Sequence, residues 1–157
     1  MTKVLPIKKT EKQAIVFIGI QASGKTTFFK QMLADKGYVH VSLDVLHTRN
    51  KEDNLLTECL ENGRSFVVDN TNPEISVREK YIKRAKEHGY QVIGIFFRSR
   101  VKDCMKRNEQ RGLTVPQKAI ACASNSLQLP SLEEGFDELY FVSINTNNNF
   151  NITPWRE

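Results

Sequence analysis

Short apolar runs alternate along the chain with stretches in which apolar residues recur every three or four positions. Runs of this length are typical of buried strands, and the longer spacing is typical of helices with one buried face. We therefore predict strands over residues 14–18, 38–43, 65–68, 91–97 and 139–144. We predict helices over residues 26–33, 52–61, 77–88 and 101–110, and a less regular helix between Pro116 and Pro130.

This order of elements predicts an α/β fold with three layers. Where strands and helices alternate, the strands pair in parallel and the helices cover both faces of the sheet. We expect a parallel five-stranded sheet in one domain over residues 13–144, preceded by a polar lead-in over residues 1–12. Residues 145–157 are rich in asparagine and are expected to form a loosely held polar tail. In such a sheet, ligands bind beyond the carboxyl ends of the strands.

Composition excludes several other classes of protein. The chain has 157 residues, 39% of them hydrophobic, which is enough for the core of one ordinary domain. Its net charge of +5 suits anionic ligands, including nucleic acid, without requiring one. No apolar run reaches the length of a membrane span or resembles a signal-peptide core, so we expect a cytoplasmic protein with no membrane partner. The three cysteines have no metal-ligand spacing and are expected to be reduced thiols.

One glycine-rich motif carries most of the chemical information. Residues 19–26 read Gly-Ile-Gln-Ala-Ser-Gly-Lys-Thr, a complete G-x-x-x-x-G-K-[ST] phosphate loop between a predicted strand and a predicted helix. Its backbone N–H groups and the helix dipole can bind phosphate, Lys25 can reach the outer phosphates, and the Thr26 hydroxyl can bind Mg²⁺. The predicted nucleoside triphosphate site consists of Gly19, Gln21, Ala22, Ser23, Gly24, Lys25, Thr26 and Thr27.

Two aspartates follow predicted strands. Asp69 comes directly after residues 66–68, where phosphate-loop proteins hold Mg²⁺ directly or through water; the alternative is that it caps a turn. Asp44 ends the second predicted strand, where its carboxylate would accept the proton of an acceptor hydroxyl and orient the oxygen for in-line attack. The alternative role for Asp44 is a helix N-cap.

Arginines follow the longest predicted strand. Arg107 and Arg111 are four residues apart and share one face of the predicted helix. Phosphate-loop kinases often carry a lid at this place, and its arginines close over the triphosphate and neutralise moving charge. We expect a lid at about residues 101–130, with Arg98 and Arg100 as further candidates. The alternative is a solvated basic surface.

The segment after the third predicted strand resembles a known family. Residues 66–73 read Phe-Val-Val-Asp-Asn-Thr-Asn-Pro, which resembles the kinase domain of polynucleotide 5′-hydroxyl kinases and small stand-alone bacterial P-loop proteins of that group. The resemblance includes Arg78, Tyr81, Gly89 and residues 133–138, and it spans residues 13–144. The phosphate loop is generic, whereas Asp-Asn-Thr-Asn-Pro in this context is more specific.

The resemblance implies an adenylate-kinase-like fold, ATP as the phosphoryl donor and a nucleic-acid 5′-hydroxyl as the acceptor. It implies that Asp44 is the catalytic aspartate and that Arg107 and Arg111 grip phosphates. The family commonly has an arginine soon after this aspartate, on the acceptor side; here His47 occupies that place and Arg49 comes later. The chain contains no D-x-D phosphatase motif, so the resemblance extends to the kinase half alone.

Together, these features predict an ATP- and Mg²⁺-dependent P-loop kinase that transfers the γ-phosphate to a polynucleotide or nucleoside 5′-hydroxyl. The predicted catalytic residues are Asp44, Lys25, Arg107 and Arg111, and the predicted metal ligands are Thr26 and Asp69. The expected acceptor contacts are His47, Arg49, Asn70, Asn72 and Arg78. Two alternatives stay open, a kinase of a small metabolite or antibiotic hydroxyl and a nucleotide-dependent switch with no phosphoryl acceptor.

Overall fold

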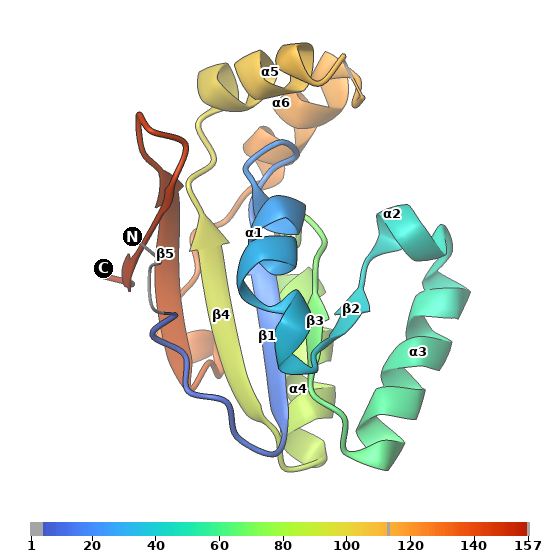
Figure 1. Cartoon of the computed structure of the whole chain (residues 1–157). Coiled ribbons are helices and arrows are strands. Elements are labelled where there is room, and N and C mark those ends of the chain that lie inside the picture. The colour runs from blue at the N-terminus through green and yellow to red at the C-terminus, as the bar shows by residue number, and fades with distance from the viewer. Residues whose placement is uncertain (1–4, 113, 157) are drawn as a thin grey trace.

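The computed structural model describes residues 5–112 and 114–156, which form one mostly parallel sheet with helices on both faces (Figure 1). The strands are β1 (Gln13–Ile18), β2 (Val39–Val41), β3 (Phe66–Val68), β4 (Gln91–Phe97), β5 (Glu138–Ile144) and β6 (Phe150–Pro154). Their order in the sheet is β2-β3-β1-β4-β5-β6. The first five run parallel, so their carboxyl ends share one edge, and β6 is antiparallel to β5. The predicted α/β class is confirmed.

Within the described residues, six helices connect the strands. They are α1 (Lys25–Met32), α2 (Leu43–Leu46), α3 (Arg49–Asn62), α4 (Ile75–Glu87), α5 (Val101–Gln110) and α6 (Gln117–Ser126), with short 3₁₀ turns at Ala34–Lys36 and Leu132–Glu134. Successive residues of a strand point to opposite faces, and β1 supplies both cores in this way. Ile15 and Phe17 pack with α1 on one face, whereas Ala14, Val16 and Ile18 pack with α3 and α4 on the other.

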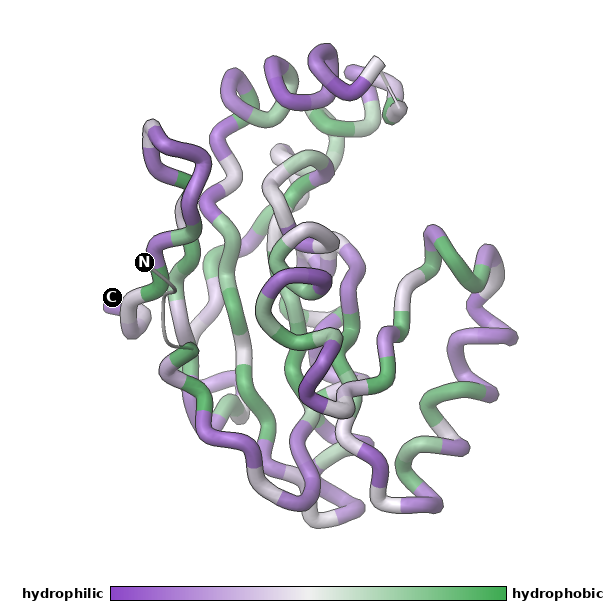
Figure 2. Tube along the Cα trace, viewed as in Figure 1, coloured by the Kyte–Doolittle hydropathy of each residue, from purple (hydrophilic) through white to green (hydrophobic). Residues whose placement is uncertain are grey.

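The number of strands differs from the prediction of five, because residues 150–154 form β6. The asparagine-rich residues before it make a tight turn, in which the Asn145 side-chain oxygen accepts bonds from the N–H groups of Asn147 and Asn149. Phe150 is then buried with its ring 5.2 Å from that of Phe28 on α1. The sequence did not indicate this strand, because residues 145–157 are mostly polar and Phe150 is the one residue of β6 that is buried. Figure 2 shows the polar turn at the tip of the β5–β6 hairpin.

The expected lid is a pair of helices, α5 and α6, beyond the carboxyl edge of the sheet (Figure 1). Their inner faces pack with Ile20 and Ala22 of the phosphate loop around Cys104 and Ile120, and polar residues predominate along α5 (Figure 2). Within the described residues, no helix has both the length and the apolar composition that crossing a bilayer requires. Of the predicted lead-in, residues 1–4 lie outside the described residues, and Ile7 is buried against the α1 face.

Candidate active site

The phosphate loop runs from the end of β1 to the first turn of α1 in the strand–loop–helix setting that its motif requires. Gly24 has a φ of 99° and Ala22 a φ of 62°, both in the left-handed region. At Gly19, a Cβ atom would lie 2.8 Å from the Ser23 Oγ atom and 3.0 Å from a Phe97 atom, so the close approach requires glycine. The loop therefore curls tightly enough to direct the amino end of α1 into an open cavity.

Lys25 is the buried cation of this loop. Its ammonium donates to the carbonyl oxygens of Gly19 at 2.8 Å and Ile20 at 2.9 Å, and the residue is 8% exposed. Burial lowers the pKa of Lys25 to about 8, although the carboxylates of Asp69 and Asp44 act in the opposite direction. An anionic ligand would give this ammonium stronger acceptors than the two carbonyl oxygens.

The lowered pKa predicts a pH-dependent stability. Above pH 8 the folded protein releases the Lys25 proton, whereas the unfolded chain keeps it up to a pKa near 10.5. The unfolded state then binds more protons, so the free energy of unfolding should rise with pH by on the order of 1 kcal/mol per unit. Urea unfolding between pH 8 and 9.5 should show this rise in the wild type relative to Lys25→Met. Parallel pH curves for the two proteins would contradict it.

The predicted metal ligands meet at the first turn of α1. The Thr26 hydroxyl donates to the Asp69 carboxylate at 2.8 Å, and the His40 Nε2 atom lies 2.8 Å from the same carboxylate oxygen. The Asp69 side chain is only 2% exposed, and the His40 ring stacks on Phe29 with centroids 4.2 Å apart. Asp69 is therefore fixed from two sides. His40 carried no signal in the sequence, because only the pairing of β2 with β3 brings it beside Asp69.

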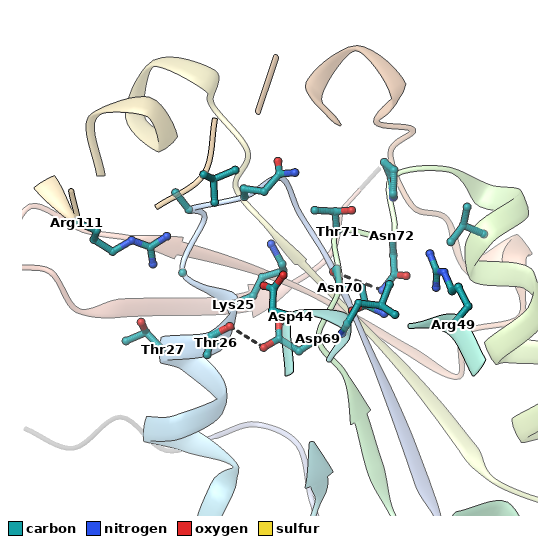
Figure 3. A pocket seen from close by; sticks show the side chains of 17 residues that line it. Lys25, Thr26, Thr27, Asp44, Arg49, Asp69, Asn70, Thr71, Asn72 and Arg111 are labelled. Carbon is teal, nitrogen blue, oxygen red and sulfur yellow. Dashed lines mark hydrogen bonds between the residues drawn. The ribbon is translucent and has the colours of Figure 1, made fainter. Parts of the chain in front are cut away.

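Asp44 lies on α2 and not at a strand end, because β2 already stops at Val41. Ser42 occupies the N-cap position, so the alternative of Asp44 as the N-cap is excluded. The Asn70 side-chain oxygen accepts a bond from the Leu43 N–H at 2.9 Å and so ties the start of α2 to the end of β3. Figure 3 shows Asp44 beside Lys25 and Asp69 in the same cavity.

This cavity has a volume of about 490 Å³ and lies beyond the carboxyl ends of β1 and β3. The predicted site residues that line it are Gln21, Ala22, Gly24, Lys25, Thr26, Thr27, Asp44, Arg49, Asp69, Asn70, Asn72 and Arg111. The predicted residues outside its lining are Gly19, Ser23, His47, Arg78 and Arg107. The structure therefore brings together the phosphate loop, both aspartates, Arg49 of α3 and Arg111 at the end of α5.

The two lid arginines have different surroundings. Arg111 follows the last turn of α5 and lines the cavity (Figure 3). The Arg107 Nε atom donates to the Ala22 carbonyl oxygen at 2.7 Å, and its side chain does not line the cavity. Arg107 therefore holds the phosphate loop in this structure. Arg98 and Arg100, the further candidates, also lie outside the lining.

Two expected acceptor contacts are corrected by the fold. Arg78 is fully buried, with its Nε atom 2.9 Å from the Glu134 carboxylate and its Nη1 atom 3.0 Å from the Gln128 carbonyl oxygen. It joins α4 to the segment after the lid and cannot reach an acceptor. His47 is the exposed C-cap of α2, with a φ of 69°, and ends that helix outside the cavity.

The Asn72 side chain also makes contacts that hold the fold together. It is 1% exposed, has a φ of 45°, and donates through Nδ2 to the Phe17 carbonyl oxygen at 2.7 Å. It thus fixes the loop after β3 to the end of β1 while lining the cavity. Its side-chain oxygen is buried and has no hydrogen-bond partner among the described residues, so the loop keeps one unused acceptor there.

Sequence reasoning missed Glu52, a buried carboxylate whose side-chain partners are Arg49, Asn70, Tyr81 and Lys80. Glu52 lies one turn before Leu56 and two turns before Leu60, on the buried face of α3. A charged residue on an apolar helical face is the signal that could have revealed it, because a buried charge needs partners. Its partners, Tyr81 and Asn70, come from distant parts of the sequence.

Comparisons with known proteins agree with this fold. A family model described as an AAA domain matches residues 15–55 and 48–130, which together span most of the chain. The crystal structure of a gluconokinase from Sinorhizobium meliloti 1021 superimposes with a TM-score of 0.61 at 18% identity, covering 86% of this chain and 84% of that one. At this identity, the likeness shows the shared fold alone.

Two curated relatives are similar in sequence. A bifunctional polynucleotide phosphatase/kinase from Schizosaccharomyces pombe is 33% identical over 135 residues, which cover 82% of this chain and 33% of that protein. An L-seryl-tRNA(Sec) kinase from Methanococcus maripaludis is 26% identical over 141 residues, covering 78% of this chain and 55% of that protein. The chain thus spans about a third of the first relative and about half of the second. It belongs to the AAA domain family, and its fold is that of the P-loop kinases.

Proposed function

We propose that the chain is an ATP-dependent phosphotransferase whose acceptor is a polynucleotide or nucleoside 5′-hydroxyl. The observation that carries this proposal is the convergence of Lys25, Asp44 and Asp69 in one cavity. A triphosphate on the loop would bring its outer phosphate to Lys25, next to a second carboxylate that is available for an alcohol. The relative named for polynucleotides is more similar to this chain than the one named for a seryl-tRNA, which favours this acceptor.

On the donor side, the loop amides and Lys25 would bind the phosphates of ATP. Thr26 and Asp69 would hold Mg²⁺, because they offer two oxygen atoms 2.8 Å apart at the phosphate-binding end of α1. This small oxygen set fits Mg²⁺, which usually keeps several waters and binds one or two carboxylates together with phosphates. When bound, the ion would offset the negative charge of the phosphates.

On the acceptor side, Asp44 would accept a hydrogen bond from the attacking hydroxyl and take its proton as the phosphoryl group moves. An ionised carboxylate does this mainly by orientation, because the transition state needs an in-line oxygen more than a strong base. Arg49 lines the same cavity and could bind an anionic group of the acceptor, such as a phosphodiester. Arg111 would stabilise charge on the transferred group from the lid side.

The contact between Arg107 and Ala22 leads to a prediction for nucleotide binding. In a trans peptide the C=O and the following N–H point in opposite directions, so holding the Ala22 carbonyl outward directs the Ser23 N–H toward the phosphates. Glutamine places a neutral N–H donor where the arginine Nε lies, and methionine does not. ATP affinity, measured by calorimetry, should stay within about threefold in Arg107→Gln and fall about tenfold in Arg107→Met. Equal losses in both variants would instead indicate that the charge matters.

The proposal is tested by incubating the protein with ATP, Mg²⁺ and a panel of acceptors. The panel contains 5′-hydroxyl oligonucleotides of DNA and RNA, nucleosides and sugars, and the product is detected as transferred radiolabel. We expect label at the 5′ end of an oligonucleotide or nucleoside. Label on a sugar alone would replace this proposal with that of a metabolite kinase. ATP hydrolysis with no labelled acceptor would favour the nucleotide-dependent switch.

A further inference from the structure

A buried carboxylate beneath the acceptor side of the cavity connects three elements of the fold. The Glu52 side chain of α3 is 2% exposed. Its Oε1 atom accepts bonds from the Tyr81 hydroxyl of α4 at 2.8 Å and from the Arg49 Nη1 atom at 3.1 Å. Its Oε2 atom accepts a bond from the Asn70 Nδ2 atom after β3 at 2.8 Å. A carboxylate so far from solvent is stable only with such a set of donors.

The first connection runs to Asp44. A carboxylate can only accept hydrogen bonds, so Glu52 requires the NH₂ group of Asn70 to face it. The Asn70 oxygen then faces the other way and accepts the Leu43 N–H at 2.9 Å. Leu43 is the first residue of α2, a helix of four residues, and the side chain of its N-cap Ser42 makes no capping hydrogen bond within the described part of the chain. Asn70 therefore caps α2 from a distance, and Asp44 is the next residue of that helix.

The second connection runs to Arg49. Its Nη1 atom is shared between the Glu52 carboxylate and the Tyr81 hydroxyl, at 3.1 and 3.0 Å. The side chain is otherwise 56% exposed and lines the cavity. Among the described residues, the Nε and Nη2 atoms of Arg49 have no hydrogen-bond partner. One edge of the guanidinium is thus anchored, while its other N–H groups remain available to a ligand.

We propose that Glu52 is a positioning residue for the acceptor half of this site, a role that rests on the phosphotransferase function proposed above. Through Asn70 it sets the place of the carboxylate of Asp44, and directly it sets the guanidinium of Arg49. Among the described residues, Glu52 makes no hydrogen bond or ion pair with the phosphate loop; its partners are Arg49, Asn70, Tyr81 and Lys80. Glu52 therefore governs productive binding of the acceptor and leaves the donor site unchanged.

The variant Glu52→Gln separates these two halves. Glutamine at position 52 presents an NH₂ group where the carboxylate had only acceptors. If this NH₂ group faces Asn70, the Asn70 amide turns its oxygen toward it, and the Asn70 NH₂ group then faces the Leu43 N–H, so that two donors oppose each other. The matched control is Asp53→Asn, which changes the neighbouring residue of α3. The Asp53 carboxylate accepts a bond from the Arg84 Nη1 atom at 2.6 Å, so this pair also joins α3 to α4, but neither residue lines the cavity. We expect kcat/KM for the acceptor to fall about 10–10²-fold in Glu52→Gln, because small misplacements of reacting groups cost that much. ATP affinity should stay within about twofold, and Asp53→Asn should match the wild type in both.

Hydrogen exchange supplies a readout that does not depend on transfer. The N–H of a first helical residue has no intrahelical acceptor, so protection of the Leu43 amide reports its bond to Asn70. By NMR, this amide should exchange at least about tenfold faster in Glu52→Gln and in Asn70→Ala than in the wild type and Asp53→Asn. The Val39 amide, which is bonded to the Ser65 carbonyl oxygen outside α2, serves as the internal reference. Asn70→Ala leaves the Glu52 charge in place and is used if Glu52→Gln does not fold.

Two results would overturn the proposal. Unchanged Leu43 exchange in both variants would show that the network does not hold α2. A loss of ATP affinity equal to the loss for the acceptor would show a general destabilisation of the site. If the wild type labelled no acceptor while the variants showed the expected differences in Leu43 exchange, the proposed function would be contradicted, and the role of Glu52 in positioning α2 would stand.

Discussion

Replacing Asp44 with asparagine should lower the rate of phosphoryl transfer by about 10²–10⁴-fold and leave ATP affinity nearly unchanged. Asparagine keeps the size of the side chain but cannot take a proton from the acceptor. Asp44 lines the same cavity as the phosphate loop, and the loop makes no hydrogen bond to it among the described residues. The loss should therefore fall on kcat and not on nucleotide binding.

Single-turnover transfer measures the chemical step, and calorimetry measures ATP binding. Asp35→Asn, an exposed aspartate on the 3₁₀ turn after α1, is the control for a lost surface carboxylate and should behave as the wild type. An Asp44→Asn enzyme with wild-type turnover would remove Asp44 from the mechanism.

Replacing Lys25 with alanine should damage ATP binding and turnover together. The ammonium would contact the outer phosphates both in the ground state and during transfer, so its loss should lower kcat/KM by about 10²–10³-fold. The alanine variant also leaves the Gly19 and Ile20 carbonyl oxygens without their donor, which adds a cost to the free loop. Lys25 thus differs from Asp44 in affecting the donor.

The control for this experiment is Lys30→Ala, which removes an exposed lysine from the last turn of the same helix. ATP affinity and kcat are measured for both variants at one ionic strength, because salt screens exposed charges more than buried ones. If Lys30→Ala lost as much affinity as Lys25→Ala, the effect would be one of general charge and not of the loop.

Much of the fold could be predicted because local pattern and final structure agree there. The bounds of β4 and α5 match the predicted ranges, since a mostly apolar run ends at Phe97 and only three polar residues separate it from a charged helical stretch. The helix predicted over residues 52–61 begins at Arg49, because the Thr48 hydroxyl caps it by accepting the Lys51 N–H. A threonine caps a helix only where the preceding turn places its hydroxyl at the helix start, so the sequence alone did not mark Thr48 as the cap.

The candidate site was predictable where a motif fixes the backbone, and less so where contacts come from distant segments. The phosphate loop and Asp69 converge as expected, because parallel strands bring their carboxyl ends to one edge. The spacing of Arg78, one turn before Tyr81 and Ile82, places it on the buried face of α4, so its burial could have been predicted. Its pairing with Glu134 could not, since 56 residues separate the two. The same holds for Glu52, whose partners belong to two other elements.

The most direct test of the account is a structure with a non-hydrolysable ATP analogue and Mg²⁺. We predict the outer phosphate at Lys25 and the Asp44 carboxylate on the open side of that phosphate, with room between them for a hydroxyl about 3 Å from each. An Asp44 carboxylate turned away from the phosphate, or a gap filled by apolar side chains, would contradict phosphoryl transfer at this site.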